Sequence, residues 1–179
     1  MSAIVRTAVL GGPGNCYRYE LRRVWDDSLP MLVVCMLNPS NADAERDDPT
    51  ILALIWFARL WGHGGLLIVN LFAFRASRPT TLVAMHAKGG AVHGAGNGKH
   101  IESALAYAAE NGGKVLAAWG NGGSLDGMDD WFVSRARSAH RLDVLCLGTT
   151  KLQMPKHPMA RGKHRIPRDQ QPIIWRRAN

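Results

Sequence analysis

A chain of 179 residues with 46% hydrophobic residues is long enough to bury a substantial core in one domain spanning residues 1–179. No segment approaches the roughly 20 consecutive apolar residues of a membrane span, and the N-terminus lacks the basic flank and long apolar stretch of a secretory signal, so we expect a cytoplasmic protein with no membrane partner. The formal net charge of +8 favours a polyanionic partner.

The chain then alternates predicted strands and helices. Residues 17–25 alternate as in an antiparallel strand, paired with residues 4–10 across a Gly-rich turn. Apolar, β-branched runs predict four further strands at 32–36, 66–71, 114–119 and 143–147, and the intervening helices are led by 49–61, 101–110 and 128–139. This order predicts an α/β fold: three α/β/α layers around a mainly parallel, four-stranded central sheet, extended by an N-terminal antiparallel hairpin.

Two segments lie outside this pattern. Residues 77–97 are rich in Pro, Gly and His and predict a mobile crossover loop over the carboxyl edge of the sheet. Residues 151–179 contain eight Lys or Arg and a single acid, Asp169, and so account for +7 of the net charge. This basic C-terminal segment predicts DNA, or another nucleic acid, as the partner; a solvated tail is the alternative. The residues expected to contact the nucleic-acid backbone are Arg161, Lys163, Arg165 and Arg168.

Candidate binding residues follow each of the four predicted central strands. The carboxyl ends of parallel strands meet at one edge, where open α/β sheets bind ligands, so we expect these residues to converge there. Amides can read the edge of a base, and lysine with histidine can hold an anion. The substrate-binding candidates, in chain order, are Ser40, Asn70, Phe72, Trp119, Asn121, Lys151 and Lys156.

The loop at residues 36–50 supplies the catalytic candidates. Asp48 precedes Pro49 and the first helical stretch, a position suited to capping the helix, so the other aspartates are the better candidates for proton transfer. The catalytic candidates are Asn38, Asp43 and Asp47, with His157 from the basic segment.

We expect neither a metal site nor a cofactor. The four acids between residues 43 and 48 could attract Mg²⁺, but their spacing fits no compact metal-binding loop. The glycine stretches match neither the phosphate-binding loop of ATPases nor the dinucleotide fingerprint, so ATP and NAD are not expected. The three cysteines lack metal-type spacing and predict unpaired thiols.

Across nearly its whole length the chain resembles a bacterial and phage family called domain of unknown function 1643. The motifs that carry the resemblance are Leu-Asn-Pro-Ser at 37–40, Asp-Asp-Pro-Thr at 47–50, Val-Asn-Leu-Phe at 69–72, Ala-Trp-Gly at 118–120 and Lys-His-Pro at 156–158. The family usually has an Asn-Asp pair before the third helix, whereas this chain reads Asn97-Gly98. The family name implies no activity.

The order of these motifs is also similar to that of the uracil-DNA glycosylase superfamily. That resemblance implies that Asn38 with Asp43 or Asp48 positions water, that Asn70 reads the base and that His157 stabilises the departing base. This chain has Met159-Ala160 where that superfamily usually has a serine after His-Pro.

Three hypotheses follow. The first is an enzyme that acts on a flipped nucleobase of DNA, either by glycosylase-like base excision or by group transfer onto a modified pyrimidine. The second is a non-catalytic module that binds nucleic acid through the basic segment. The third is an enzyme of small-molecule nucleotides, in which the basic segment plays no part. The oligomeric state stays open.

Overall fold

Four apolar runs form the centre of the sheet, because a strand covered on both faces must be apolar throughout. The computed structural model describes residues 3–40 and 42–179. In it, these runs become β3 (Met31–Met36), β4 (Gly65–Asn70), β5 (Lys114–Ala117) and β6 (Asp143–Cys146). They lie side by side in the order β4-β3-β5-β6, and all three pairings are parallel.

The whole sheet is larger than the predicted four strands and is mixed. β1 (Val5–Gly11) and β2 (Tyr17–Val24) form the predicted antiparallel hairpin, β2 pairs antiparallel with β4, and β7 (Ile173–Arg176) pairs antiparallel with β6. The described sheet therefore has seven strands in the order β1-β2-β4-β3-β5-β6-β7. The α/β class is confirmed, whereas the predicted number of strands is wrong: β7 adds an edge strand beyond β6, and the hairpin joins the central strands antiparallel through β2, so the sheet is mixed.

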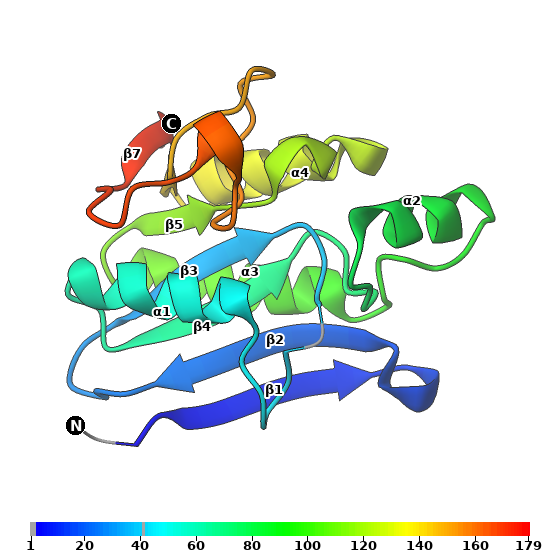
Figure 1. Cartoon of the computed structure of the whole chain (residues 1–179), viewed down its shortest axis with the longest axis horizontal. Helices are drawn as coiled ribbons and strands as arrows, with labels where there is room; N and C mark the ends of the chain where they lie inside the picture. Colours follow the sequence, from blue (N-terminus) through cyan, green and yellow to red (C-terminus); the bar gives the residue numbers. More distant parts are fainter. Residues whose placement is uncertain (1–2, 41) are drawn as a thin grey trace.

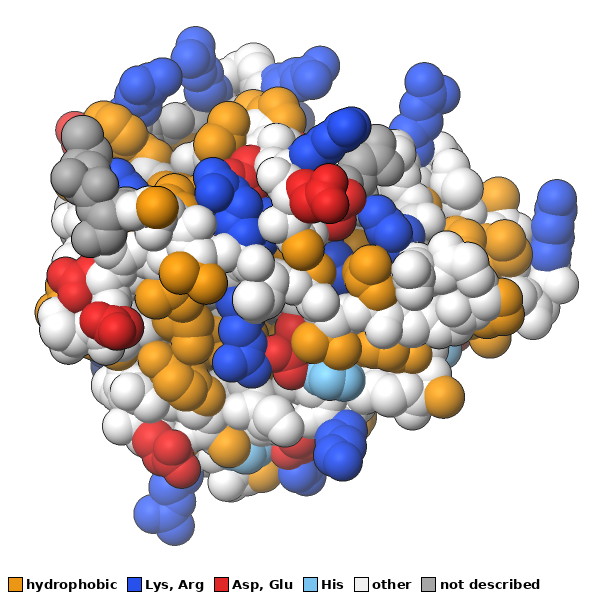
Figure 2. All heavy atoms as spheres, turned by 90° about the horizontal axis from the view of Figure 1, so that it is seen from below, with side chains coloured by type: hydrophobic (Ala, Val, Ile, Leu, Met, Phe, Trp, Pro, Cys, Tyr) orange, Lys and Arg blue, Asp and Glu red, His pale blue; other side chains and the backbone are white. Residues whose placement is uncertain are grey.

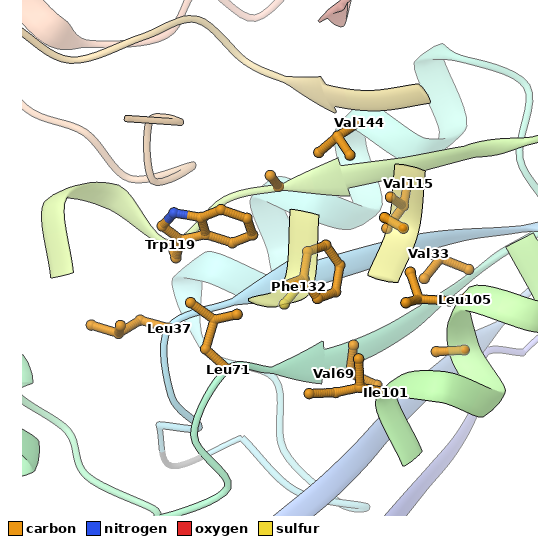
Figure 3. Close-up of a cluster of buried hydrophobic side chains, with 14 of the residues drawn as sticks. Val33, Leu37, Val69, Leu71, Ile101, Leu105, Val115, Trp119, Phe132 and Val144 are labelled. Carbon is orange, nitrogen blue, oxygen red and sulfur yellow. The ribbon is translucent and has the colours of Figure 1, made fainter. Parts of the chain in front are cut away.

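Helices cover both faces of the sheet (Figure 1). α1 (Pro49–Leu60) packs on one face; α3 (Asn97–Glu110) and α4 (Met128–Ser134), which continues into a π-helical turn at Arg135–Ala139, pack on the other. Each face has its own hydrophobic core, because successive strand residues point to opposite sides. Val33 and Val69 contribute to the cluster under α3 and α4, part of which is drawn in Figure 3, and Val34 and Ile68 to the cluster under α1.

Residues 77–97 contain a helix that the sequence did not predict. α2 (Pro79–Ala87) begins at a proline, which is favoured in the first turn, but only Leu82 of its residues is buried, so no apolar stripe marked it. The stretch after α2 is held to the N-terminal hairpin, because Tyr17 Oη donates to the carbonyl of Ala91 at 2.6 Å, and to the segment after β4, because the N–H of Phe74 donates to the carbonyl of Val92 at 3.1 Å. The crossover is therefore partly helical and anchored.

The three cysteines are unpaired, and Cys35 and Cys146 are buried, as predicted. Burial raises the pKa of both of these thiols, so they behave as small apolar groups. None of the helices in the described residues is long and apolar enough to cross a membrane.

Candidate active site

A pocket of about 280 Å³ opens at the carboxyl ends of β3 and β5, the edge at which the sequence predicts the site. This volume lies near the lower end of the roughly 300–1,000 Å³ of small-molecule pockets. Its wall comes from β2, the loop after β3, the start of α1, the segment before α2, and the loops after β5 and β6. The lining residues are Arg18, Met36, Leu37, Asn38, Ser40, Asp48, Thr50, Ile51, Ala76, Ser77, Pro79, Trp119 and His157.

His157 is held in the pocket wall by a tight turn. The backbone N–H of Met159 donates to its Nδ1 at 3.1 Å, and the N–H of Ala160 donates to its carbonyl at 2.9 Å. Because Nδ1 accepts, the proton of a neutral ring sits on Nε2, which makes no hydrogen bond to the described residues. Burial lowers the pKa of His157, and the charge of Asp48 opposes that shift. The pocket therefore holds a neutral imidazole with an available N–H donor.

Asp48 caps α1 and also lines the pocket. Its Oδ1 accepts a hydrogen bond from the N–H of Ile51 at 2.9 Å, as expected for the residue before a helix that starts with proline. Its Oδ2 accepts a short hydrogen bond from the hydroxyl of Ser40. The helix cap thus fixes the Asp48 carboxylate, which is hydrogen-bonded to the Ser40 hydroxyl. The carboxylate lies close enough to His157 for its charge to act on the imidazole.

Asn38 lines the pocket, and its amide is held in place by the backbone. Its Nδ2 donates to the backbone carbonyls of Ala76, at 2.8 Å, and Pro39, at 3.1 Å. These two acceptors fix the orientation of the amide. Among the described residues none donates to Oδ1, so a lining side chain retains an acceptor for a ligand N–H or a water.

Arg18 is a pocket residue that the sequence reasoning missed. It is 2% exposed, its guanidinium donates to the carbonyl of Ala42, and its Nε has no partner among the described residues. Burial lowers its pKa to about 10, while Asp48 opposes the shift, so the side chain stays charged at neutral pH. The buried charge faces this pocket because Tyr19 is left out of the pairing with β1 and the alternation of side chains shifts there.

Asp43 and Asp47, the acids favoured from the sequence, are not among the pocket-lining residues. Asp47 accepts hydrogen bonds from Nε of Arg23 at 2.6 Å and Nε of Arg6 at 3.3 Å. Asp43 Oδ1 accepts from two backbone N–H groups of its own loop, both at 2.9 Å, and these bonds lower the pKa of Asp43. These carboxylates hold the loop in shape and fasten it to the hairpin.

Asn70 lies beside the pocket, behind its surface. It pairs with Met36, a lining residue, in the parallel register of β3 and β4, and its side chain is 0% exposed. Neither Nδ2 nor Oδ1 of Asn70 has a hydrogen-bond partner among the described residues. An unpaired buried amide costs about 1–3 kcal/mol, so a water or a ligand group that reached it would be bound favourably.

Phe72 and Trp119 belong mainly to the core. Phe72 is fully buried in the cluster under α3 and α4. Trp119 borders the pocket but is only 2% exposed, and its ring packs edge-on against Phe132 and Trp175, with centroids 5.5 and 5.6 Å away (the first pair is drawn in Figure 3). Gly123 lies against the Trp119 indole where a side chain would not fit. Both aromatics support the pocket wall from behind.

The remaining candidates lie on the loops next to the pocket. Asn121 Oδ1 accepts a hydrogen bond from Thr150 Oγ1 at 2.6 Å, which ties the loop after β5 to the loop after β6. Lys151 is exposed, and Lys156 is partly buried over Gly148. None of Asn121, Lys151 and Lys156 is among the residues that line the pocket.

The basic segment forms a second hollow beside α1. Arg161, Arg165 and Arg168 line a groove of about 630 Å³, and Lys163 is exposed between them in sequence. The face seen from below in Figure 1 instead carries acidic side chains among its basic ones (Figure 2). Within the described residues, no group of three or more His, Cys, Asp or Glu side chains could hold a metal ion.

The comparison with protein families assigns the sequence to a known group. A family model described as "Protein of unknown function (DUF1643)" matches residues 18–159. The chain belongs to this family. The part that matches DUF1643 contains every residue that lines the 280 Å³ pocket, whereas the arginines of the second groove lie beyond its end. No curated protein and no solved structure matches this DUF1643 chain.

Proposed function

We propose that this protein is an enzyme that acts on a nucleobase of DNA, drawn out of its stack into the pocket at the ends of β3 and β5. The observation that carries the proposal is that Asp48 and His157 line one small pocket, with Nδ1 of His157 engaged as an acceptor and its Nε2 left to face a ligand. A carboxylate can accept a proton from a nucleophile, while an imidazole N–H can stabilise a developing negative charge.

For base excision, Asp48 takes a proton from water as the water oxygen bonds to C1′ of the sugar. The bond between C1′ and the base nitrogen breaks, and its electron pair leaves with the base. The Nε2–H of His157 donates to the base oxygen on which negative charge develops, and Asn38 Oδ1 accepts from a base N–H. In group transfer, an amine replaces water: its nitrogen bonds to the substituent carbon of a modified pyrimidine as it loses its proton to Asp48, and the bond from that carbon to its leaving group breaks, with the electron pair departing on the leaving group.

Arg18 adds a fixed positive charge to this pocket. Charges act more strongly where water is excluded, so a buried guanidinium stabilises an anionic base more than an exposed one does. Asp48 takes the place that the sequence favoured for Asp43 or Asp47, because those two carboxylates are engaged elsewhere. The order of the strand-end motifs, similar to that of uracil-DNA glycosylases, supports a glycosylase-like arrangement of the same loops.

The proposal is tested by incubating the protein with single- and double-stranded DNA that contains uracil or a modified pyrimidine. Mass spectrometry of the free bases and of the digested nucleosides separates excision, which releases a base, from transfer, which shifts the mass of a nucleoside. Asp48→Asn and His157→Gln should each lower turnover by about 10²–10⁴-fold. Glu45→Gln, at an exposed acid of the same loop, is the matched control and should retain turnover.

Two other outcomes would replace the proposal. Salt-sensitive DNA binding with an unchanged digest would indicate a non-catalytic nucleic-acid-binding module. Turnover of free nucleotides without any on DNA would indicate a small-molecule nucleotide enzyme. Full turnover in both Asp48→Asn and His157→Gln would remove the chemical basis of the proposal.

A further inference from the structure

The second groove exposes an aromatic ring on the outer face of α1. Trp56 is 50% exposed, although hydrophobic residues of a helix on a sheet normally face the core. Its indole N–H donates to the carbonyl of Arg168 at 2.9 Å, and the guanidinium of Arg168 lies 5.4 Å from the ring centroid. The ring is therefore held at a set orientation from one side and keeps a large accessible surface.

The groove around Trp56 is apolar with a positively charged rim. Leu52, one turn before Trp56, and Met159 are large exposed hydrophobic residues of its wall. Arg161 and Arg165 join Arg168 in the lining, which includes no acidic residue. Such a combination of an aromatic platform, apolar surface and several arginines suits a ligand with flat rings and negative charges.

The walls of the groove and of the pocket share two chain segments. Pro49 lines the groove and directly follows Asp48, and Pro158 lines the groove and directly follows His157. The groove therefore lies beside the pocket, so a nucleic-acid strand with one base in the pocket has a second binding surface nearby.

We propose that this groove binds unpaired nucleotides of a single-stranded nucleic acid, with one base stacked on Trp56 and the phosphates contacted by Arg161, Arg165 and Arg168. The inference rests on the proposed function, since it assigns the form of nucleic acid that delivers a base to the pocket. Single strands are favoured because the bases of a duplex are stacked on each other and offer no free face to an indole. An acidic peptide would satisfy the arginines but would leave the ring unused.

The test measures binding of a fluorescein-labelled oligothymidylate of about a dozen nucleotides by fluorescence anisotropy. Trp56→Leu should weaken binding roughly 5- to 150-fold, the range expected for loss of one base–aromatic stack. Trp56→Phe, which keeps an aromatic ring, should retain much of the wild-type affinity. Leu60→Ala, an exposed residue of α1 outside the groove, is the control and should bind like the wild type. Arg165→Gln should lower the slope of log affinity against log salt by roughly 0.7.

Three results would overturn the groove assignment. The first is that Trp56→Leu binds the oligonucleotide as tightly as the wild type. The others are that Trp56→Leu weakens binding of a duplex of the same length by the same factor, or that polyglutamate of equal charge displaces the oligonucleotide. The double variant Asp48→Asn/His157→Gln separates this inference from the proposed function. It should lose base chemistry and keep Trp56-dependent binding. Trp56-dependent binding with no base chemistry on any substrate refutes only the enzyme, whereas base chemistry without an effect of Trp56→Leu on binding refutes only the groove.

Discussion

Replacing Asp47 with alanine leaves the guanidinium of Arg23 buried without its carboxylate partner. Arg23 is 0% exposed, and its Nε donates to Asp47 at 2.6 Å. Its other N–H groups donate to the backbone carbonyls of Arg22, Asp43 and Arg46. Removing one partner of a buried ion pair costs about 3–5 kcal/mol. We expect a loss of about 3 kcal/mol, at the low end, because the three carbonyls remain as acceptors.

That loss is a large share of the roughly 5–15 kcal/mol by which folded domains are stable. For a protein of this size it corresponds to a fall in Tm of about 6–12 °C. Replacing both partners, as Arg23→Met with Asp47→Leu, removes both desolvated charges together. The double variant leaves the carbonyls of Arg22, Asp43 and Arg46 without this donor but leaves no unpaired buried charge, so it should be less destabilised than Asp47→Ala alone.

Urea unfolding followed by tryptophan fluorescence and circular dichroism measures these differences. Glu45→Ala, an exposed acid in the same loop, is the control and should change the unfolding free energy by no more than about 0.5 kcal/mol. A wild-type midpoint for Asp47→Ala would refute the buried-pair reasoning. Loss of base chemistry at unchanged stability would return Asp47 to the catalytic position that the sequence suggested for it.

Three further predictions concern the pocket. Burial lowers the pKa of His157 below its ordinary 6.5, so this imidazole takes up a proton more readily in the unfolded chain than in the folded one. The folded protein should therefore lose stability as the pH falls below 6.5. Denaturant midpoints measured against pH should show this decline, and His157→Gln should flatten it. Asp48→Ala should lower the free energy of unfolding by about 0.5–2 kcal/mol because the helix cap is lost. Asp48→Asn keeps a capping side chain and should lower it less, although both variants lose turnover. Equal unfolding midpoints for the two variants would argue against the cap. Gly123→Ala places a methyl group against the buried indole of Trp119, and thermal unfolding should show a loss of about 1–3 kcal/mol; an unchanged Tm would mean that the ring can shift.

Local signals predicted the parts of the fold that depend on neighbouring residues. The four central strands were recognisable because they are buried on both faces and so are apolar throughout. Asp-Pro-Thr at 48–50 marked the start of α1 because capping and the preference for proline in the first turn act over a few residues. β7 was harder to recognise, because it is short, lies at the edge and is largely exposed.

The path of the first loop decided which acid reaches the pocket. Asp47 and Asp48 are adjacent in sequence, yet one is paired with Arg23 and the other lines the pocket, because successive residues of an irregular loop point in different directions. No local pattern distinguishes them. Arg18 shows the same limit, since its burial in the pocket wall follows from a bulge in β2 and from packing against a loop 24 residues away.

By itself the sequence determined the α/β class, the central strands, the family and the edge of the sheet at which polar residues gather, because burial and turn preferences are recorded in the residues themselves. Only the tertiary structure decided which of those residues share a pocket: Asp48 and Arg18 line it, and Asn70 lies behind it. It also placed Trp56 on the surface beside the arginines of the basic segment. Such choices depend on contacts between segments far apart in the chain, and a single sequence carries no direct record of those contacts.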